Sequence, residues 1–136
     1  METIPLWAAG KSAPRAQPAE GASYARKISK EDGRIDWCGP ARVLWNRVRA
    51  FTPWPGAFTS IEIDGRQKLL KIWKAEVCEN GGAHPGEVIR CHDGEIVVRC
   101  GENAVQILSL QLEGGRRLSA QEFLAGHTLS VRQRLG

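Results

Sequence analysis

Two Asp-Gly dipeptides constrain the fold of this chain more than any other local feature. Asp64-Gly65 and Asp93-Gly94 each separate two runs in which β-branched or apolar residues alternate with polar ones. A two-residue type I′ turn needs positive φ at both central positions, and Asp followed by Gly tolerates that conformation. The pattern therefore predicts two β-hairpins within a sheet of short antiparallel strands.

The same alternation predicts five strands in all. Gly-rich turns separate them, in keeping with 15 glycines among 136 residues, which is about 11% against a usual share of roughly 7%. The predicted strands cover residues 57–63, 67–78, 86–91, 95–100 and 104–112.

Two helices are predicted to flank the strands. The first covers residues 40–50, because Pro40 suits the first helical position. Ser119 and Glu122 form a capping box that opens a short second helix, which Gly126 ends. These elements together predict a mainly β fold: a small five-stranded, OB-fold-like antiparallel barrel with a preceding helix and a short C-terminal helix. A five-stranded meander and a half-open sandwich are the alternatives.

The first 38 residues differ from the rest in composition. Residues 2–9 are predicted to form a short helical piece, and residues 11–21 have the Pro, Ala and charge content of a linker. Residues 24–37, called the basic strap below, place cations between a few apolar side chains and are predicted to be extended. We therefore divide the chain into an N-terminal helix and extended linker, residues 1–38, and a folded domain, residues 39–136.

Charge is distributed unevenly along the chain. Residues 11–74 hold 13 Lys and Arg against 6 Asp and Glu, a sum of +7, whereas residues 75–115 sum to −5 and residues 116–136 to +3. A basic half of this size can bind a polyanion such as a nucleic acid. It is equally compatible with an ordinary solvated surface, so charge alone leaves both interpretations open.

No catalytic or metal site is predicted from motifs. The four cysteines lack CxxC spacing and are interpreted as small buried apolar residues, and His84, Cys91 and His92 lack the spacing of zinc ligands. The chain also lacks a phosphate-binding glycine loop, a GxSxG elbow and an HExxH pair. Because no apolar run reaches the length of a membrane span, we expect a cytoplasmic protein with no membrane partner.

The second predicted strand carries the most suggestive side-chain pattern. If Leu70 and Ile72 face the core, then Lys71 and Trp73 face outward and place a cation beside an aromatic ring. Such a pair on a barrel wall is typical of surfaces that contact nucleic-acid bases or backbones. The alternative is that the basic strap covers Trp73, since an exposed indole loses burial energy.

Five motifs follow one another along the chain: YARKISKEDGRIDW at 24–37, RAFTPWPGA at 49–57, LKIWKA at 70–75, LSLQL at 108–112 and GRRLSAQEFL at 115–124. Together they closely resemble the C-terminal domain of the methionyl-tRNA formyltransferase family. Residues 2–10 also resemble the last helix of that family's catalytic domain. The resemblance extends over nearly the whole chain.

The resemblance implies a binding role in translation initiation. The family's enzymes transfer a formyl group from 10-formyltetrahydrofolate to methionine on initiator tRNA, with catalytic and folate-binding groups in an N-terminal domain. It therefore implies no catalytic residue, metal or cofactor in this chain, and two partners: initiator tRNA, mainly through its phosphates, and the N-terminal catalytic domain. A rival interpretation is the structural C-terminal domain of a related formyltransferase that acts on a nucleotide sugar or on folate, without RNA binding.

The resemblance also points to particular residues. It implies a set of lysines and arginines, given at the end of this paragraph, that would contact RNA phosphates through an ammonium or a bidentate guanidinium group. Such contacts give affinity without recognising the base sequence. For each of these residues, an ordinary solvated surface position fits equally well. Arg116 and Arg117 are weaker candidates. Trp37, Phe51, Trp54 and Pro55 are interpreted as packing residues. The candidate RNA contacts are Arg26, Lys27, Lys30 and Arg34 in the strap, Arg42 and Arg49 on the first helix, and Lys71 on the barrel.

Overall fold

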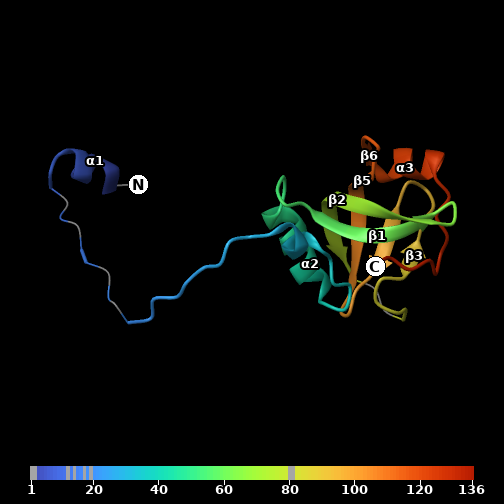
Figure 1. Ribbon diagram of the computed structural model, residues 1–136, viewed down its shortest axis with the longest axis horizontal. Helices are drawn as coiled ribbons and strands as arrows, with labels where there is room; N and C mark the ends of the chain where they lie inside the picture. The colour runs from blue at the N-terminus through green and yellow to red at the C-terminus, as the bar shows by residue number, and fades with distance from the viewer. Residues whose placement is uncertain (1–2, 12, 14, 17, 19, 80–81) are drawn as a thin grey trace.

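The structure, a computed structural model, describes residues 3–11, 13, 15–16, 18, 20–79 and 82–136. Within these residues six strands pair in one antiparallel sheet, with a helix before it and a short helix after it (Figure 1). Along the chain the elements are α1 (Thr3–Ala8), the 3₁₀ helix η1 (Lys30–Gly33), α2 (Ala41–Ala50), β1 (Ala57–Ile63), β2 (Arg66–Cys78), β3 (Val88–Arg90), β4 (Ile96–Arg99), β5 (Ala104–Leu112), β6 (Arg117–Ser119) and α3 (Ala120–Gly126).

The strand order is β1-β2-β5-β4-β3, and β6 adds to β5 beside β4. This order confirms the predicted mainly β fold with its two flanking helices. It rules out a meander, because β2 pairs with β5 rather than with β3. The described sheet has six strands instead of the predicted five, since Leu118 of β6 pairs with Leu110 of β5. The likeness to an OB-fold stays a prediction.

Local turn chemistry sets the two hairpins. The φ angles are +53° at Asp64 and +71° at Gly65, and +51° at Asp93 and +77° at Gly94, as a type I′ turn requires. In the long strand β2 the register shifts on both sides of Lys74. This bulge leaves Lys74 exposed although its sequence parity would point it toward the core.

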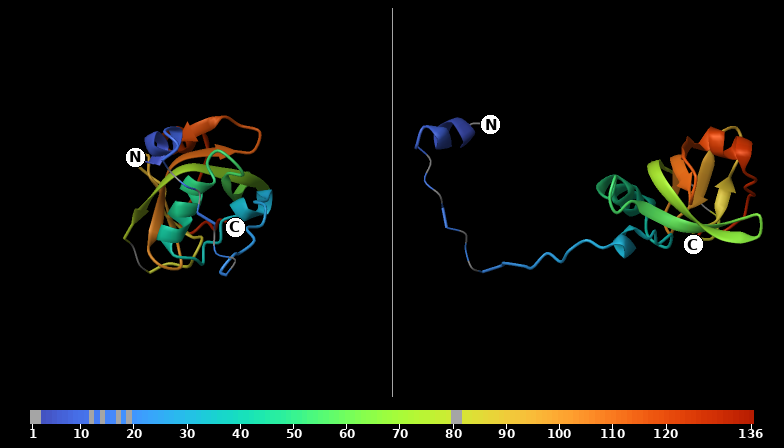
Figure 2. Two further views of the ribbon diagram at one scale, coloured as in Figure 1. Left: turned by 90° about the vertical axis from the view of Figure 1, so that its left-hand side faces the viewer. Right: turned by 45° about the horizontal axis from the view of Figure 1, so that its top comes forward.

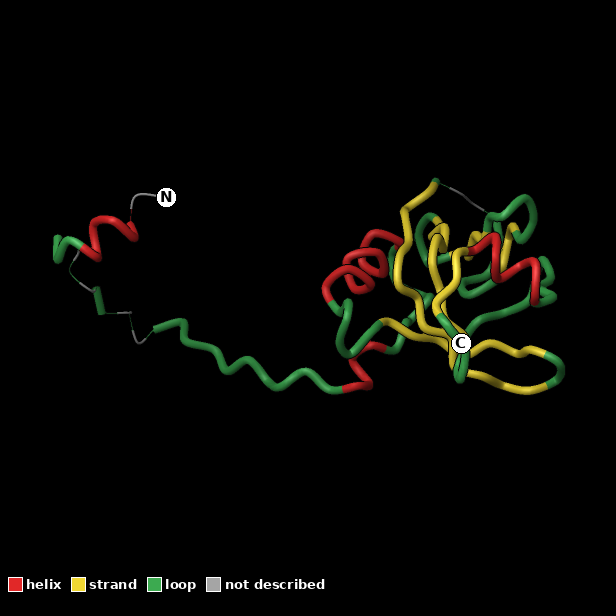
Figure 3. Tube along the Cα trace, turned by 90° about the horizontal axis from the view of Figure 1, so that it is seen from above, coloured by secondary structure: helices red, strands yellow, loops and turns green. Residues whose placement is uncertain are grey.

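The last residues of the chain, 130–136, join the two edge strands of the sheet; we call them the closing segment. On the β3 side, Val88 N–H donates to Gln133 O at 2.9 Å and Arg132 N–H donates to Val88 O at 2.8 Å. On the β1 side, Gly136 N–H donates to Ser60 O at 3.0 Å. The C-terminus therefore lies between these strands (Figures 1 and 3), and the curled sheet leaves neither edge fully open.

The end of the basic strap is part of the core. Ile35 and Trp37 are buried, and Ile35 N–H donates to Phe58 O at 2.8 Å, which places the strap beside β1. The indole N–H of Trp37 donates to the buried Thr59 hydroxyl at 3.1 Å. The core thus begins at Ile35, while the predicted division of the chain at residue 38 stays a prediction.

One predicted packing residue proves to be exposed. Trp37 and Pro55 are buried and Phe51 is half-buried, but the side chain of Trp54 is 64% exposed. The reason is a tight loop between α2 and β1, closed by a 2.9 Å hydrogen bond from Gly56 N–H to Phe51 O. Trp54 lies near the tip of that loop, so it does not fix the strap or the helix to the sheet.

Both flanking helices bury one face. In α2 the residues Ala41, Leu44 and Val48 are buried, and the helix lies against one end of the sheet, whereas α3 lies beside β5 and β6 (Figure 2). Pro40 is the N-cap of α2, whereas the sequence predicted it as the first helical residue. Its side chain does not cap the helix, and the N–H of Ala41, the first helical residue, donates to Glu102 O at 2.9 Å. Gly126 was predicted to end the C-terminal helix, but α3 includes Gly126 as its last residue.

The short helix α1 lies apart from the sheet, beyond the extended chain that leads to η1 (Figure 1). It covers most of the predicted helical piece, and Glu2 at the start of that prediction is outside the described residues. Ile4 and Trp7 are exposed. None of the helices described here is long and apolar enough to cross a membrane.

The predicted capping box of α3 is present, and it allows a stability test. The Ser119 hydroxyl accepts from Glu122 N–H at 3.2 Å, and the Glu122 carboxylate accepts from Ser119 N–H at 2.8 Å, which lowers the pKa of Glu122. Ser119→Ala is expected to destabilise the protein by about 1 kcal/mol. Ser130→Ala, at an exposed serine outside any helix cap, is the control. Equal urea midpoints for the two variants would show that the cap contributes nothing.

Candidate nucleic-acid interface

Two of the four strap cations already have carboxylate neighbours. The Arg26 guanidinium donates to both carboxylate oxygens of Asp32, one at 2.9 Å, and the Ser29 N–H donates to the same carboxylate at 2.7 Å. These donors hold the pKa of Asp32 well below its usual range, the Arg26 hydrogen bond being the largest cause. Arg34 pairs with Glu31 at 3.1 Å. Because these pairs are exposed, they order η1 locally more than they stabilise the fold.

The strap is seated on the sheet at Gly33 and Arg34. A Cβ on Gly33 would lie 2.1 Å from Gly56 O, so only glycine allows the strap to approach this loop so closely. The Arg34 guanidinium lies 5.3 Å from the centroid of the Phe58 ring, and Arg47 of α2 donates to Arg34 O at 3.0 Å. The backbone around η1 is therefore fixed between α2 and β1, with its lysines left outside.

Lys27 and Lys30 are the strap cations without a carboxylate partner in the described parts of the chain. Both are exposed. Lys30 also lines a groove on the outer face of β1, β2 and β5. The strap therefore divides into two arginines that hold its shape and two lysines whose ammonium groups are available to an anion.

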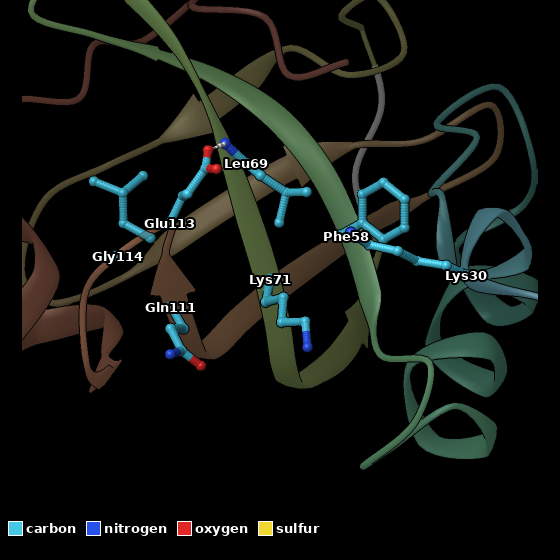
Figure 4. A pocket seen from close by; sticks show the side chains of 8 residues that line it. Lys30, Phe58, Leu69, Lys71, Gln111, Glu113 and Gly114 are labelled. Carbon is cyan, nitrogen blue, oxygen red and sulfur yellow. Dashed lines mark hydrogen bonds between the residues drawn. The ribbon is translucent and has the colours of Figure 1, made fainter.

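The groove has a volume of about 310 Å³ (Figure 4). Phe58 and Leu69 supply apolar surface, and Lys30 and Lys71 supply the cations. The carboxylate of Glu113 accepts from Leu69 N–H at 3.2 Å. The groove thus combines apolar walls with two ammonium groups from separate elements. Its complete lining is Lys30, Phe58, Leu69, Lys71, Gln111, Leu112, Glu113 and Gly114.

The predicted alternation along β2 is confirmed. Leu70 and Ile72 are buried, while Lys71 and Trp73 are half-buried on the other face. The Lys71 ammonium lies 5.4 Å from the centroid of the Trp73 ring. Arg117 of β6 lies 5.2 Å from the same ring. Cations from β2 and β6 therefore lie over the Trp73 ring. The alternative prediction had been that the basic strap covers this ring.

A second cation and aromatic cluster lies on α2. The guanidinium groups of Arg42 and Arg49 are 5.0 and 4.2 Å from Trp45 ring centroids. The sequence reasoning named the two arginines but missed Trp45 between them. Its position three residues after one arginine and four before the other is a spacing that places all three side chains on one helix face, so the signal was available.

The thiols and imidazoles are dispersed. Burial raises the pKa of the Cys100 thiol to about 12, which leaves it an unreactive core residue as predicted. Cys38, in contrast, is exposed, and Cys78 and Cys91 are half-buried. Over the described ranges no three His, Cys, Asp or Glu side chains gather to hold a metal ion.

The arrangement of these groups suits the binding of anions. Seven predicted cations occupy three neighbouring elements: the strap, α2 and β2. Of these, Arg26 and Arg34 are ion-paired, whereas Lys27, Lys30, Arg42, Arg49 and Lys71 have no such pair in the part of the chain that the structure describes. Unpaired, solvent-accessible cations of this kind bind phosphates by charge.

Comparison with known protein families gives a match to the model of the formyl transferase C-terminal domain, over residues 27–128. Curated relatives include methionyl-tRNA formyltransferases from Caldanaerobacter subterraneus subsp. tengcongensis, 46% identical over 94% of this chain, and from Neisseria meningitidis serogroup C, 49% identical over 85% of it. The matched regions are 40% and 36% of those relatives. The chain therefore spans about two fifths of their length.

Solved structures with a similar fold include HypX from Aquifex aeolicus. One HypX variant matches 95% of this chain and 23% of its own, with a TM-score of 0.61 and 23% sequence identity. HypX in complex with tetrahydrofolic acid matches 90% of this chain with the same TM-score and identity. At this identity the likeness concerns the fold alone.

Proposed function

The chain belongs to the formyl transferase C-terminal domain family, and we propose that it is the tRNA-binding C-terminal domain of a methionyl-tRNA formyltransferase. In this role it helps to position initiator methionyl-tRNA for formyl transfer from 10-formyltetrahydrofolate at translation initiation. Relatives that carry the name methionyl-tRNA formyltransferase, at 41–49% identity, support this specific assignment.

The proposal divides the work between two domains. The formyl donor and the catalytic groups belong to an N-terminal catalytic domain, which is the second partner of this chain. This chain supplies binding surface and, by itself, no formyl transfer. For such an enzyme we propose a cytoplasmic location.

The observation that carries the proposal is the set of unpaired cations around the strap. Lys30 belongs to η1, whose backbone is fixed to the sheet at Gly33 and Arg34, and Lys27 precedes it. Arg42, Arg49 and Lys71 lie on the neighbouring α2 and β2. The backbone of Lys30, Arg42, Arg49 and Lys71 belongs to ordered elements, so it loses little further order on binding, which favours affinity for a folded polyanion. Phosphate contacts of this kind orient an RNA without reading its bases.

Binding of initiator tRNA across a salt series tests the proposal. The native chain is compared with the variant Lys27→Ala/Lys30→Ala/Arg42→Ala, which removes three of the unpaired cations. We expect weak binding that falls steeply with salt, and a slope of log K against log salt that is shallower by about 3 in the variant, one for each lost phosphate contact.

The matched control is Arg66→Ala/Arg132→Ala/Arg134→Ala, which removes the same charge from exposed positions outside the strap, α2 and the groove. An equal loss of affinity in both variants would show that binding depends on the net charge of the chain and not on the positions of these cations. Absence of tRNA binding by the native chain at low salt would contradict the proposal. It would favour the rival role, a structural domain in a formyltransferase that acts on a nucleotide sugar or on folate.

A further inference from the structure

The outer face of the sheet holds a cation pair built around one aromatic ring. Lys71 lies 5.4 Å and Arg117 lies 5.2 Å from the centroid of Trp73. The two cations come from β2 and β6, which pair with β5 and lie far apart in sequence. The Trp73 ring therefore contacts two cations that are far apart in the sequence.

Hydrogen bonds fix the members of this cluster. The indole N–H of Trp73 donates to Gln111 Oε1 at 3.0 Å, and the amide of Gln111 donates to Gly115 O at 2.8 Å. Figure 4 shows Lys71 and Gln111 side by side on this face of the sheet. Trp73 is thus tied through β5 to the turn that leads into β6, and its ring has one defined orientation.

Arg117 is held in a similar way. Its Nε donates to Ser109 Oγ at 2.9 Å, and Ser109 Oγ donates to Leu118 O at 3.1 Å. The terminal nitrogens of the guanidinium have no hydrogen-bond partner among the residues that the structure describes, and Arg117 is exposed. The cluster on α2 lacks such anchoring, because neither Arg42 nor Arg49 has a side-chain hydrogen bond in the described structure.

The cluster of Lys71, Arg117 and Trp73 carries two positive charges and is therefore suited to binding an anion. Neither Lys71 nor Arg117 forms an ion pair with any residue that the structure describes. An indole face attracts a cation through its quadrupole but does not cancel the charge. Two such cations on one ring repel each other, and an anion placed between or beside them relieves that repulsion.

A base that stacks on this ring would compete with the two cations. The N–H of the ring is used by Gln111, and Lys71 and Arg117 lie within cation–π distance of the ring. Surfaces that stack bases leave an aromatic face open. The cluster therefore suits the phosphodiester backbone of an RNA rather than its bases.

We propose that Lys71 and Arg117 form a clamp for the phosphate backbone of folded RNA, and that Trp73 is the positioning residue that holds the two cations together. The proposal deepens the proposed function and rests on it for the identity of the natural RNA. The clamp itself recognises backbone charge, so it acts on any structured RNA regardless of sequence.

The first test measures binding of a fluorescein-labelled RNA hairpin of unrelated sequence to the full chain by anisotropy. Lys71→Gln/Arg117→Gln is expected to bind about tenfold more weakly at low salt, with a salt slope shallower by about 2. The matched control, Arg66→Gln/Arg134→Gln, removes the same charge from exposed positions outside the clamp. Equal losses in the two double variants overturn the clamp.

The second test addresses Trp73. Trp73→Phe keeps an aromatic face for the two cations and is expected to bind the hairpin within about twofold of the native chain, whereas Trp73→Leu is expected to approach the affinity and salt slope of the Lys71→Gln/Arg117→Gln variant. Thermal melts establish that both variants are folded. A folded Leu variant that binds like the Phe variant overturns the positioning role, and if Leu does not fold, the cation variants decide.

The two RNAs separate this inference from the proposed function. If the native chain binds the hairpin through the clamp but fails to bind initiator tRNA, the clamp stands and the proposed function fails. If tRNA binding depends on the strap lysines while the clamp variants bind both RNAs normally, the proposed function stands and the clamp fails. A native chain that binds neither RNA overturns both.

Discussion

Replacing Trp37 with alanine is expected to lower the free energy of unfolding by about 3–5 kcal/mol. The indole is only 5% exposed, and it lies in the core cluster together with Leu135. Gly86 lies beside the ring, since a Cβ added there would be in ordinary van der Waals contact with the indole at 3.5 Å. Alanine would leave a cavity there, and the buried Thr59 hydroxyl would lose the donor that now binds it at 3.1 Å.

Urea unfolding measures the loss of stability in Trp37→Ala, and two further variants serve as comparisons. Trp37→Phe keeps most of the apolar volume but removes the indole N–H, so we expect a smaller loss of about 1–2 kcal/mol. Trp54→Ala, at a tryptophan that is 64% exposed, is expected to cost less than about 0.5 kcal/mol. Similar midpoints for Trp37→Ala and Trp54→Ala would refute the central role of Trp37.

Deleting the closing segment, residues 130–136, is expected to destabilise the fold by more than about 3 kcal/mol. The deletion removes Leu135, which is 4% exposed, and the hydrogen bonds that join β3 to β1. It also exposes two sheet edges, so the truncated protein should aggregate more readily than the native chain. Chemical unfolding and light scattering measure the two effects.

Point variants separate the lost core contact from the lost edge pairing. Leu135→Ala is expected to cost about 2–5 kcal/mol, whereas Val131→Ala, at a side chain that is 52% exposed, is expected to cost less than about 0.5 kcal/mol. Aggregation should rise in the truncated chain but not in Leu135→Ala. A truncated chain with the native unfolding midpoint would contradict the proposed closure.

Sequence alone predicted the parts of the fold that local chemistry determines. The two Asp-Gly turns and the limits of β1 and β5 agree with the structure because positive φ and alternation are encoded in adjacent residues. The short strand β6 and the closing segment were missed. β6 has one apolar residue among three, and the closing segment pairs with the edge strands through only a few backbone hydrogen bonds. Neither segment shows a periodic pattern.

The candidate cations follow from the family resemblance rather than from charge alone, and their contact with RNA stays a prediction. The sequence correctly predicted the outward face of Lys71 and Trp73. It did not show that Arg26 binds Asp32, because that contact depends on the turn of η1. Nor did it bring Arg117 to Trp73, since the contact needs β6 beside β5. Tertiary structure therefore decides which cations are available.

The closing segment also bears on how the chain folds. The hydrogen bond from the Gln133 amide to Glu62 O joins residues 71 positions apart, so the loop-closure entropy must be overcome before this contact forms. Contacts of such long range slow folding and tend to form after the folding nucleus. We therefore expect sheet closure to be a late step of folding, so that weakening it accelerates unfolding more than it slows refolding.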